Sequence, residues 1–198
     1  MPAARDPRAT FPHERQSDGS QHMVTKVETR KWQRAYLNLF RKAGIVLTSR
    51  EQRALETADF GLGEMDRIGL GLVVYVNTER CCAKELALLP YQTCPEHRHP
   101  PTGAGSPGKE ETFRCRWGKV RLYVPGRRAA RIKARLPRGR ESFFTVWREI
   151  ELNPGDQYTL KPDTLHWFQA GAAGAVISEF STKSTDENDC FTDPGIRR

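Results

Sequence analysis

The chain has 198 residues, which suits one domain with its own hydrophobic core and argues against a second domain. Hydrophobic residues make up 37%, and no apolar run approaches the roughly 18 residues of a membrane-spanning helix. The formal net charge is +8, but residues 127–141 alone hold seven basic residues against one acidic residue. The charge is therefore local, and a nucleic-acid partner is not expected from it.

Residues 1–22 are rich in proline, arginine, serine and glutamine and show no apolar periodicity. They predict a disordered tail ahead of one domain over residues 23–198, and Met23 is an alternative start. The tail lacks the apolar core of a signal peptide. The five cysteines match neither a zinc site nor a disulfide framework, which predicts free thiols and a cytoplasmic protein.

Two helices are predicted over about residues 27–58. Apolar residues in the first recur at spacings of three and four, namely Trp32, Tyr36, Leu39, Phe40 and Ala43. Thr48 and Glu51 have the spacing of a capping box and begin the second helix, which we expect to run to about residue 58. These helices either cover one mouth of the domain or form a dimer contact.

The rest of the chain predicts short strands separated by turns. We expect a turn at Gly118, between two strands of a hairpin, and a hairpin loop over residues 171–174. The expected strands are 70–76, 84–89, the strand that carries His97 and His99, 111–117, 120–124, 142–152, 158–160, the strand from His166 and 175–181. Such regular spacing is typical of an all-β barrel or jelly roll.

Three histidines and a carboxylate have the pattern of a metal site. His97 and His99 are two residues apart, so on a strand both side chains face the same side. Strand alternation also turns Glu111 and His166 inward, whereas Glu110 faces the other way. Three nitrogens and one oxygen suit a divalent ion such as Mn²⁺, Fe²⁺, Co²⁺, Ni²⁺ or Zn²⁺.

These residues lie in motifs that resemble those of the cupin superfamily. The motifs are His97-Arg98-His99, Glu111 followed after six intervening residues by Gly118, Pro154-Gly155-Asp156, and Pro162 followed after three intervening residues by His166. Two features depart from the cupin pattern. Tyr91 stands where the first motif has a glycine, and residues 100–108 form a long spacer that we interpret as an inserted loop.

Several separated stretches also resemble the cupin-type D-lyxose ketol-isomerases, in the same order along the chain. They are residues 75–85, 94–101, 111–116, 166–171 and 179–186. The resemblance runs from about Trp32 to Pro194. It implies a single cupin (jelly-roll) barrel with N-terminal helices, a homodimer, and a sugar substrate.

The activity implied by the resemblance is a metal-dependent interconversion of D-lyxose and D-xylulose, with D-mannose and D-fructose as further substrates, through a metal-chelated enediol. Mn²⁺ is the expected ion, with Co²⁺, Fe²⁺, Ni²⁺ and Zn²⁺ as alternatives. Two other functions remain open from the residues: an Fe²⁺-dependent cupin dioxygenase, and a non-enzymatic sugar-binding or regulatory protein.

Further site residues follow from the resemblance. It implies that Glu179 moves the proton between C2 and C1, although from the residues alone Glu179 could equally pair with a cation inside the barrel. Lys84 is the candidate for stabilising the enediolate charge, and Glu85 can align in its place. The candidates for sugar contacts are Tyr158, Trp167, Asp186 and Asp189.

The basic stretch 127–141 has two interpretations. It contains proline and glycine but no aromatic residue on which a base could stack. A solvated loop is one interpretation, and a phosphate or nucleic-acid contact is the other.

Overall fold

The computed structural model describes residues 26–103 and 105–197, so the predicted tail 1–22 lies outside the described residues. Its elements in chain order are α1 (Lys26–Lys42), α2 (Ser49–Ala54), β1 (Glu56–Ala58), β2 (Leu70–Asn77), β3 (Cys82–Leu88), β4 (Thr93–Arg98), β5 (Glu111–Val124), the 3₁₀ helix η1 (Glu141–Phe143), β6 (Arg148–Leu152), β7 (Gln157–Leu160), β8 (His166–Ser181), the 3₁₀ helix η2 (Asp186–Asn188) and β9 (Cys190–Phe191). Within this part of the chain, no helix is long and apolar enough to cross a membrane.

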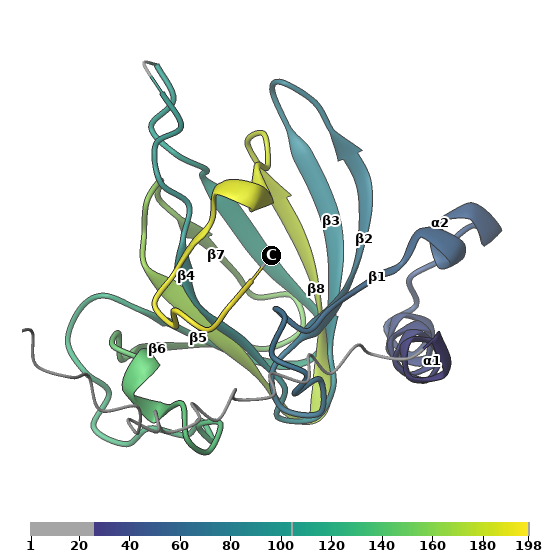
Figure 1. Ribbon diagram of the computed structural model, residues 1–198, viewed down its shortest axis with the longest axis horizontal. Helices are drawn as coiled ribbons and strands as arrows, with labels where there is room; N and C mark the ends of the chain where they lie inside the picture. The colour runs from purple at the N-terminus through teal and green to yellow at the C-terminus, as the bar shows by residue number, and fades with distance from the viewer. Residues whose placement is uncertain (1–25, 104, 198) are drawn as a thin grey trace, which may run out of the picture.

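The strands form one curled antiparallel sheet (Figure 1). Its main order is β1-β2-β3-β8-β4-β9, and β5 pairs with β6, β7 and β8. The second half of β8 pairs with β3, its first half pairs with β4, and β5 runs along both halves. Because β8 divides its pairing between two neighbours, the sheet closes around an interior. The predicted class, an all-β cupin-like barrel with N-terminal helices, is confirmed.

Two predicted turns are wrong. Gly118 lies inside β5, and residues 171–174 lie inside β8, so both strands continue where the sequence suggested that they reverse. Gly118 has a φ of 74° and sits in a bulge, where an added Cβ would lie 2.1 Å from the carbonyl oxygen of Gly174. The glycines therefore bend two paired strands and let their backbones approach closely, without ending the pairing.

Two other expected elements are shorter than predicted. The capping box of Thr48 and Glu51 is confirmed, but α2 ends at Ala54 and residues 56–58 pair with β2 as β1. The strand expected over 142–152 begins only at Arg148, after η1. In both places the element ends or begins where a neighbouring strand is present to pair with it. Local sequence does not encode the position of that neighbour.

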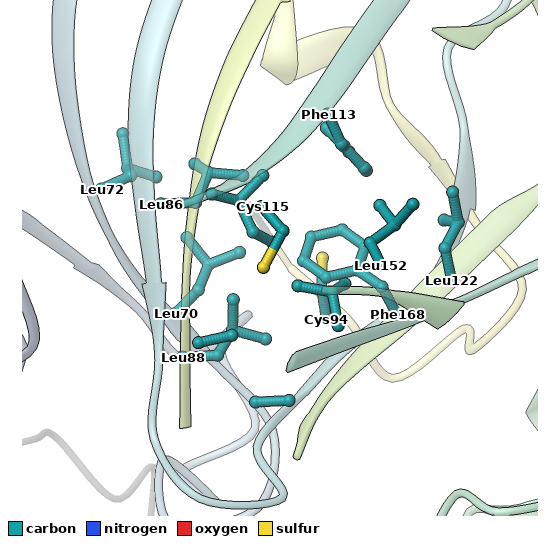
Figure 2. Close-up of a cluster of buried hydrophobic side chains, with 14 of the residues drawn as sticks. Leu70, Leu72, Leu86, Leu88, Cys94, Phe113, Cys115, Leu122, Leu152 and Phe168 are labelled. Atoms are coloured by element: carbon teal, nitrogen blue, oxygen red, sulfur yellow. The ribbon is translucent and has the colours of Figure 1, made fainter. Parts of the chain in front are cut away.

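The hydrophobic core has one part inside the barrel and one outside it. Figure 2 shows the inner part, which includes Leu70, Leu72, Leu86, Leu88, Cys94, Phe113, Cys115, Leu122, Leu152 and Phe168. Outside, Tyr36, Leu39 and Phe40 of α1 pack on Val73, Ala87 and Val176 of the sheet. Helix α1 therefore covers the outer wall of its own barrel, and the barrel interior is left for a site.

Candidate metal centre and active site

Three buried histidines meet inside the barrel. His97 in β4 is in register with His166 in β8, and His99 follows directly after β4. One ligand nitrogen from each histidine lies within 4.8 Å of the other two. Strand pairing explains this convergence, because partners across two antiparallel strands face the same side of the sheet. The structure thus brings together the three histidines that the sequence singled out.

Each histidine is held through its Nδ1 atom. That of His97 lies 2.8 Å from the carbonyl oxygen of Pro95, and that of His166 lies 2.8 Å from the carbonyl oxygen of Thr164. Nδ1 of His99 lies 2.5 Å from Oδ1 of Asp189. Acceptors at Nδ1 fix the ring orientation and leave Nε2 to face the centre, as in histidines that bind metal ions.

Glu111 completes the group. Its Oε1 lies 3.2 Å from Nε2 of His99 and 3.0 Å from Nε2 of His166. Burial raises the pKa of the Glu111 carboxyl, but the nearby Lys109, His99 and His166 outweigh burial and hold that pKa well below its usual value. Glu111 is therefore a carboxylate at neutral pH, the form that binds a metal ion.

The donor set fits a divalent transition metal. Nε2 of His166 is buried, lies close to Glu111, and makes no aligned hydrogen bond within the described residues. A buried polar atom without a partner is rare in folded proteins, and a coordinated ion removes the penalty. Burial, together with the neighbouring His166 and His99, also lowers the pKa of His97 well below its ordinary value, which favours the neutral imidazole that ligates metals.

A buried lysine, which the sequence analysis missed, links this group to Glu179. Nζ of Lys109 lies 2.7 Å from Oε2 of Glu111 and 2.6 Å from Oε1 of Glu179. Burial alone would lower the pKa of Lys109, but the two carboxylates outweigh it and raise that pKa. A signal was present, because Lys109 shares the alternation of Glu111 and Phe113, but the predicted strand began only at residue 111.

Glu179 faces the barrel interior, as expected. It is in register with Lys84 on one side and with Phe113 on the other, and its side chain is buried. Lys84 and Glu85 were the two alternatives for the residue beside Glu179 that stabilises charge on the substrate. Lys84 lines the same small cavity as Glu179, whereas the carboxylate of Glu85 accepts a hydrogen bond of 2.7 Å from Ser178. The ammonium group of Lys84 contacts Asp186, with 2.9 Å to each carboxylate oxygen.

Two adjoining cavities surround the cluster. The inner one has a volume of about 40 Å³, and its polar lining is His97, His99, Lys109, Glu111, Lys84, Glu179, Asp186 and Asp189. The outer one has a volume of about 510 Å³ and is lined by residues of the 100–108 loop and the 182–189 segment. His99, Lys109 and Asp189 line both cavities, so the outer cavity leads to the cluster.

The two aromatic candidates for sugar contacts lie elsewhere. Trp167 stacks on Tyr123 with ring centroids 4.0 Å apart, on the opposite side of β8 from His166. The reason is strand alternation, since neighbouring residues face opposite sides of a sheet. Tyr158 lies in β7, two strands away from β8, and packs against the core. Neither residue lines the inner or the outer cavity.

No protein-family model matches the chain, but its sequence is similar to those of curated relatives over most of its length. The chain is 57% identical over 176 residues to the D-lyxose/D-mannose isomerase of Thermosediminibacter oceani, covering 89% of this chain and 97% of that protein. It is 61% identical over 160 residues to the D-lyxose ketol-isomerase of Cohnella laeviribosi, covering 81% of this chain and 87% of that protein.

Solved structures share the fold at low sequence identity. The L-ribose isomerase of Acinetobacter sp. DL28, in complex with L-ribose, has a TM-score of 0.73 at 16% identity and covers 90% of this chain and 96% of its own. The L-ribose isomerase of Cellulomonas parahominis has a TM-score of 0.70 at 15% identity, with coverages of 89% and 95%.

The curled antiparallel barrel, with three inward histidines and a carboxylate, defines a protein with a cupin-like fold and a candidate metal centre. Its sequence identity to the curated relatives then narrows the class. The chain belongs to the D-lyxose ketol-isomerase family.

Proposed function

We propose that this chain is a metal-dependent aldose–ketose isomerase that interconverts D-lyxose and D-xylulose, and also D-mannose and D-fructose. The names of the curated relatives support this activity. The observation that carries the proposal within the molecule is a buried carboxylate, Glu179, joined through Lys109 to the cluster of three histidines and Glu111.

In this proposal His97, His99, His166 and Glu111 hold a divalent ion, with Mn²⁺ as our first choice. When bound, such an ion acts as a Lewis acid that polarises the substrate oxygens and acidifies the neighbouring C–H bond. Co²⁺, Fe²⁺, Ni²⁺ and Zn²⁺ have the same preference for nitrogen and carboxylate ligands, so ligand identity does not select among them.

Glu179 is the proposed general base. Isomerisation through an enediol requires one group that takes the proton from C2 of the aldose and returns it to C1. The buried carboxylate of Glu179 reaches the inner cavity and is held at Oε1 by the ammonium group of Lys109. We also assign Lys109 the role of a hydrogen-bond donor to the oxyanion that develops on the substrate, because a cation in a water-poor cavity stabilises such charge.

The outer cavity is the proposed place for the rest of the open-chain sugar. At about 40 Å³ the inner cavity holds only the reacting end, whereas the outer cavity of about 510 Å³ accommodates a pentose or a hexose. Asp189 lines both and offers an acceptor for sugar hydroxyls, and Asp186 lines the inner one. Tyr158 and Trp167 have no part in this proposal.

The activity is tested with the metal-stripped protein, supplied again with Mn²⁺ and assayed with D-lyxose. Formation of D-xylulose that depends on the added ion is the expected result. If Mn²⁺ binds stoichiometrically and neither D-lyxose nor D-mannose yields a ketose, the isomerase proposal is wrong. Oxygen consumption with Fe²⁺ would then be the next assay.

The role of Glu179 is tested by Glu179→Gln. The amide cannot accept the C2 proton, so turnover should fall by about 10²–10⁴, the usual contribution of general-base catalysis. The variant should still bind Mn²⁺. Glu141→Gln, at an exposed position in η1, is the matched control and should keep normal turnover. Near-normal turnover of Glu179→Gln would remove Glu179 from the mechanism.

Three further expectations stay predictions: that Mn²⁺ is the native ion, that the protein acts as a homodimer, and that it is cytoplasmic. Metal analysis of the protein as purified from its source addresses the first. Sedimentation analysis addresses the second.

A further inference from the structure

The C-terminal strap, which we define as residues 182–192, crosses the barrel from β8 to β4 (Figure 1). At its first end the amide group of Asn77 bonds to the backbone of Ser184, at 2.9 and 3.1 Å. At its second end β9 pairs with β4 at His97 and Arg98. The strap therefore joins the wall that carries Lys84 and Glu179 to the strand that carries His97 and leads directly into His99.

Lys84 anchors the first end of the strap from inside the barrel. Its Nζ lies 2.8 Å from Oγ of Ser184 and 2.9 Å from each carboxylate oxygen of Asp186. The side chain of Lys84 is 5% exposed, and that of Asp186 is 26% exposed. A lysine this deeply buried requires a counter-charge, so the ion pair holds the strap in one position on β3.

At its second end the strap touches the candidate metal centre twice. Asp189 accepts the hydrogen bond from Nδ1 of His99. The ring of Phe191 stacks on that of His97, with centroids 5.4 Å apart. Groups that hold the far side of a metal-binding histidine set its orientation and thereby its affinity for the ion. The position of the strap thus determines how His99 faces the centre.

We propose that Lys84 is a positioning residue that acts on the metal centre through the strap. The route runs from Lys84 to Asp186, along the strap to Asp189, and from there to His99. The inference rests on the metal site of the proposed function. It differs from a direct role for Lys84 beside the substrate, because its effect reaches the site through the backbone of the strap.

The sign of one measurement separates the two roles. A positive charge in the cavity repels a metal ion, so removing a lysine that acts only through its charge leaves metal binding unchanged or makes it tighter. Removing a lysine that orients a ligand weakens metal binding. The two roles of Lys84 therefore predict opposite changes in Mn²⁺ affinity.

The test is Lys84→Met in the full chain, stripped of metal and titrated with Mn²⁺ by calorimetry. Loss of a group that directly holds a metal ligand typically costs 10–100-fold in affinity. Lys84 acts one step further away, so we expect a loss of about 10-fold. Lys119→Met, which removes a half-exposed lysine paired with Glu151 on the outer surface, should bind Mn²⁺ like the wild type. Unchanged or tighter binding by Lys84→Met overturns the proposal.

A second variant tests the route. Asp186→Asn alone should also weaken Mn²⁺ binding, and adding Lys84→Met to it should cause little further loss, because the anchor is already broken. Independent, additive losses would show that Lys84 does not act through Asp186. At saturating Mn²⁺ the EPR spectrum of Lys84→Met should differ from that of the wild type, since His99 is no longer held in one orientation.

Hydrogen exchange makes failure of this inference distinguishable from failure of the proposed function. In the metal-free chain, Lys84→Met should increase amide exchange over residues 182–192, and Lys119→Met should not. If the wild type binds no Mn²⁺, the proposed function fails, while the exchange data still test the anchor. Unchanged exchange in the strap of Lys84→Met overturns the inference by itself.

Discussion

At the scale of single residues, the centre of the barrel depends on one cation between two carboxylates. Lys109 contacts Glu111 and Glu179, and all three side chains are buried. Without that charge two buried carboxylates would lie side by side, and Glu179 would lose the one ion-pair partner that it has among the described residues. Removing one partner from a buried charged group usually destabilises a protein by about 3–5 kcal/mol.

Lys109→Met should therefore lower the free energy of unfolding of the metal-free protein by about 3–5 kcal/mol. Added Mn²⁺ should raise the unfolding midpoint more than in the wild type, because the ion takes over the neutralisation of Glu111. Thermal unfolding with and without Mn²⁺ measures both effects, and Lys119→Met, at a half-exposed position on the outer surface, is the control. An unchanged midpoint in the metal-free variant would contradict this account of Lys109.

Glu85 gives a second prediction, in which pH is the variable. Its side chain is buried, Oε1 accepts from Ser178, and Oε2 has no hydrogen-bond partner within the described residues. Burial raises the pKa of Glu85 above its ordinary 4.5, against the opposing effects of Ser178 and Arg116. The folded state thus binds this proton more tightly than the unfolded state, so the contribution of Glu85 to stability falls as the pH rises above about 4.5.

Glu85→Gln cannot ionise, so it should gain stability relative to the wild type as the pH rises from about 4.5 toward neutral. Urea unfolding of both proteins across this range measures the difference. The same comparison with Glu141→Gln, an exposed glutamate, should show no such trend. A difference between Glu85→Gln and the wild type that stays constant with pH would mean that Glu85 has the same pKa in both states.

At the scale of elements, β5 and β8 organise the molecule. Together they carry Glu111, His166 and Glu179, and they remain paired over most of their length. The pairing survives two bulges because Gly118 and Gly174 allow their backbones to touch. If the pairing of β5 with β8 were interrupted at Gly118, β5 would no longer hold both the half of β8 that carries His166 and the half that carries Glu179.

Gly118→Ala should therefore destabilise the protein more than Gly155→Ala. Both glycines have a positive φ, 74° and 96°, so both substitutions incur left-handed strain of about 1–2 kcal/mol. Only at Gly118 would the new Cβ meet backbone, at 2.1 Å, whereas at Gly155 nothing lies within 4 Å. Unfolding free energies of the two variants give the comparison. Equal losses would show that the close approach of β5 and β8 adds nothing beyond strain.

At the scale of the whole molecule, sequence patterns predicted the inward-facing residues of the strands better than they predicted the residues that line the sugar pocket. Strand alternation placed Glu111, His166 and Glu179 inward. In the structure Glu111 and Glu179 line one cavity, and His166 contacts Glu111. The same alternation turns Trp167 outward, beside Tyr123, which its assignment to the sugar pocket overlooked. A period-two pattern shows which residues share one face of a strand. It does not show which of the two faces lines the pocket, because that depends on how the strands pack in the fold.

Contacts between distant segments could not be predicted. Lys84 and Asp186 are 102 residues apart, and Asp189 reaches His99 only because the C-terminal strap crosses the barrel. Gly118 also reads as a turn in sequence, because a bulge and a turn call for the same residue. What separates them is whether a partner strand continues alongside, which is a property of the folded sheet.

Several cations of the basic stretch 127–141 have partners within their own chain. Lys133 contacts Glu149 and Glu151, and the guanidinium group of Arg135 lies 3.6 Å from the ring centroid of Tyr91. These contacts favour the interpretation as a folded loop over that as a nucleic-acid contact, because charges held by internal partners are less available to phosphates.

Arg140, also in the basic stretch, is paired with carboxylates from two segments that are distant in the sequence. Its guanidinium group lies 3.0 Å from Glu64, which precedes β2, and 2.5 Å from the buried Asp193, which follows β9. Arg140→Met should lower the free energy of unfolding by about 1–3 kcal/mol, since it leaves the carboxylate of Asp193 without its cation. Arg138→Met, at an exposed position in the same stretch, should change the unfolding midpoint little. If both variants unfold like the wild type, the stretch is held by its apolar contacts and the Arg140 contacts contribute nothing measurable.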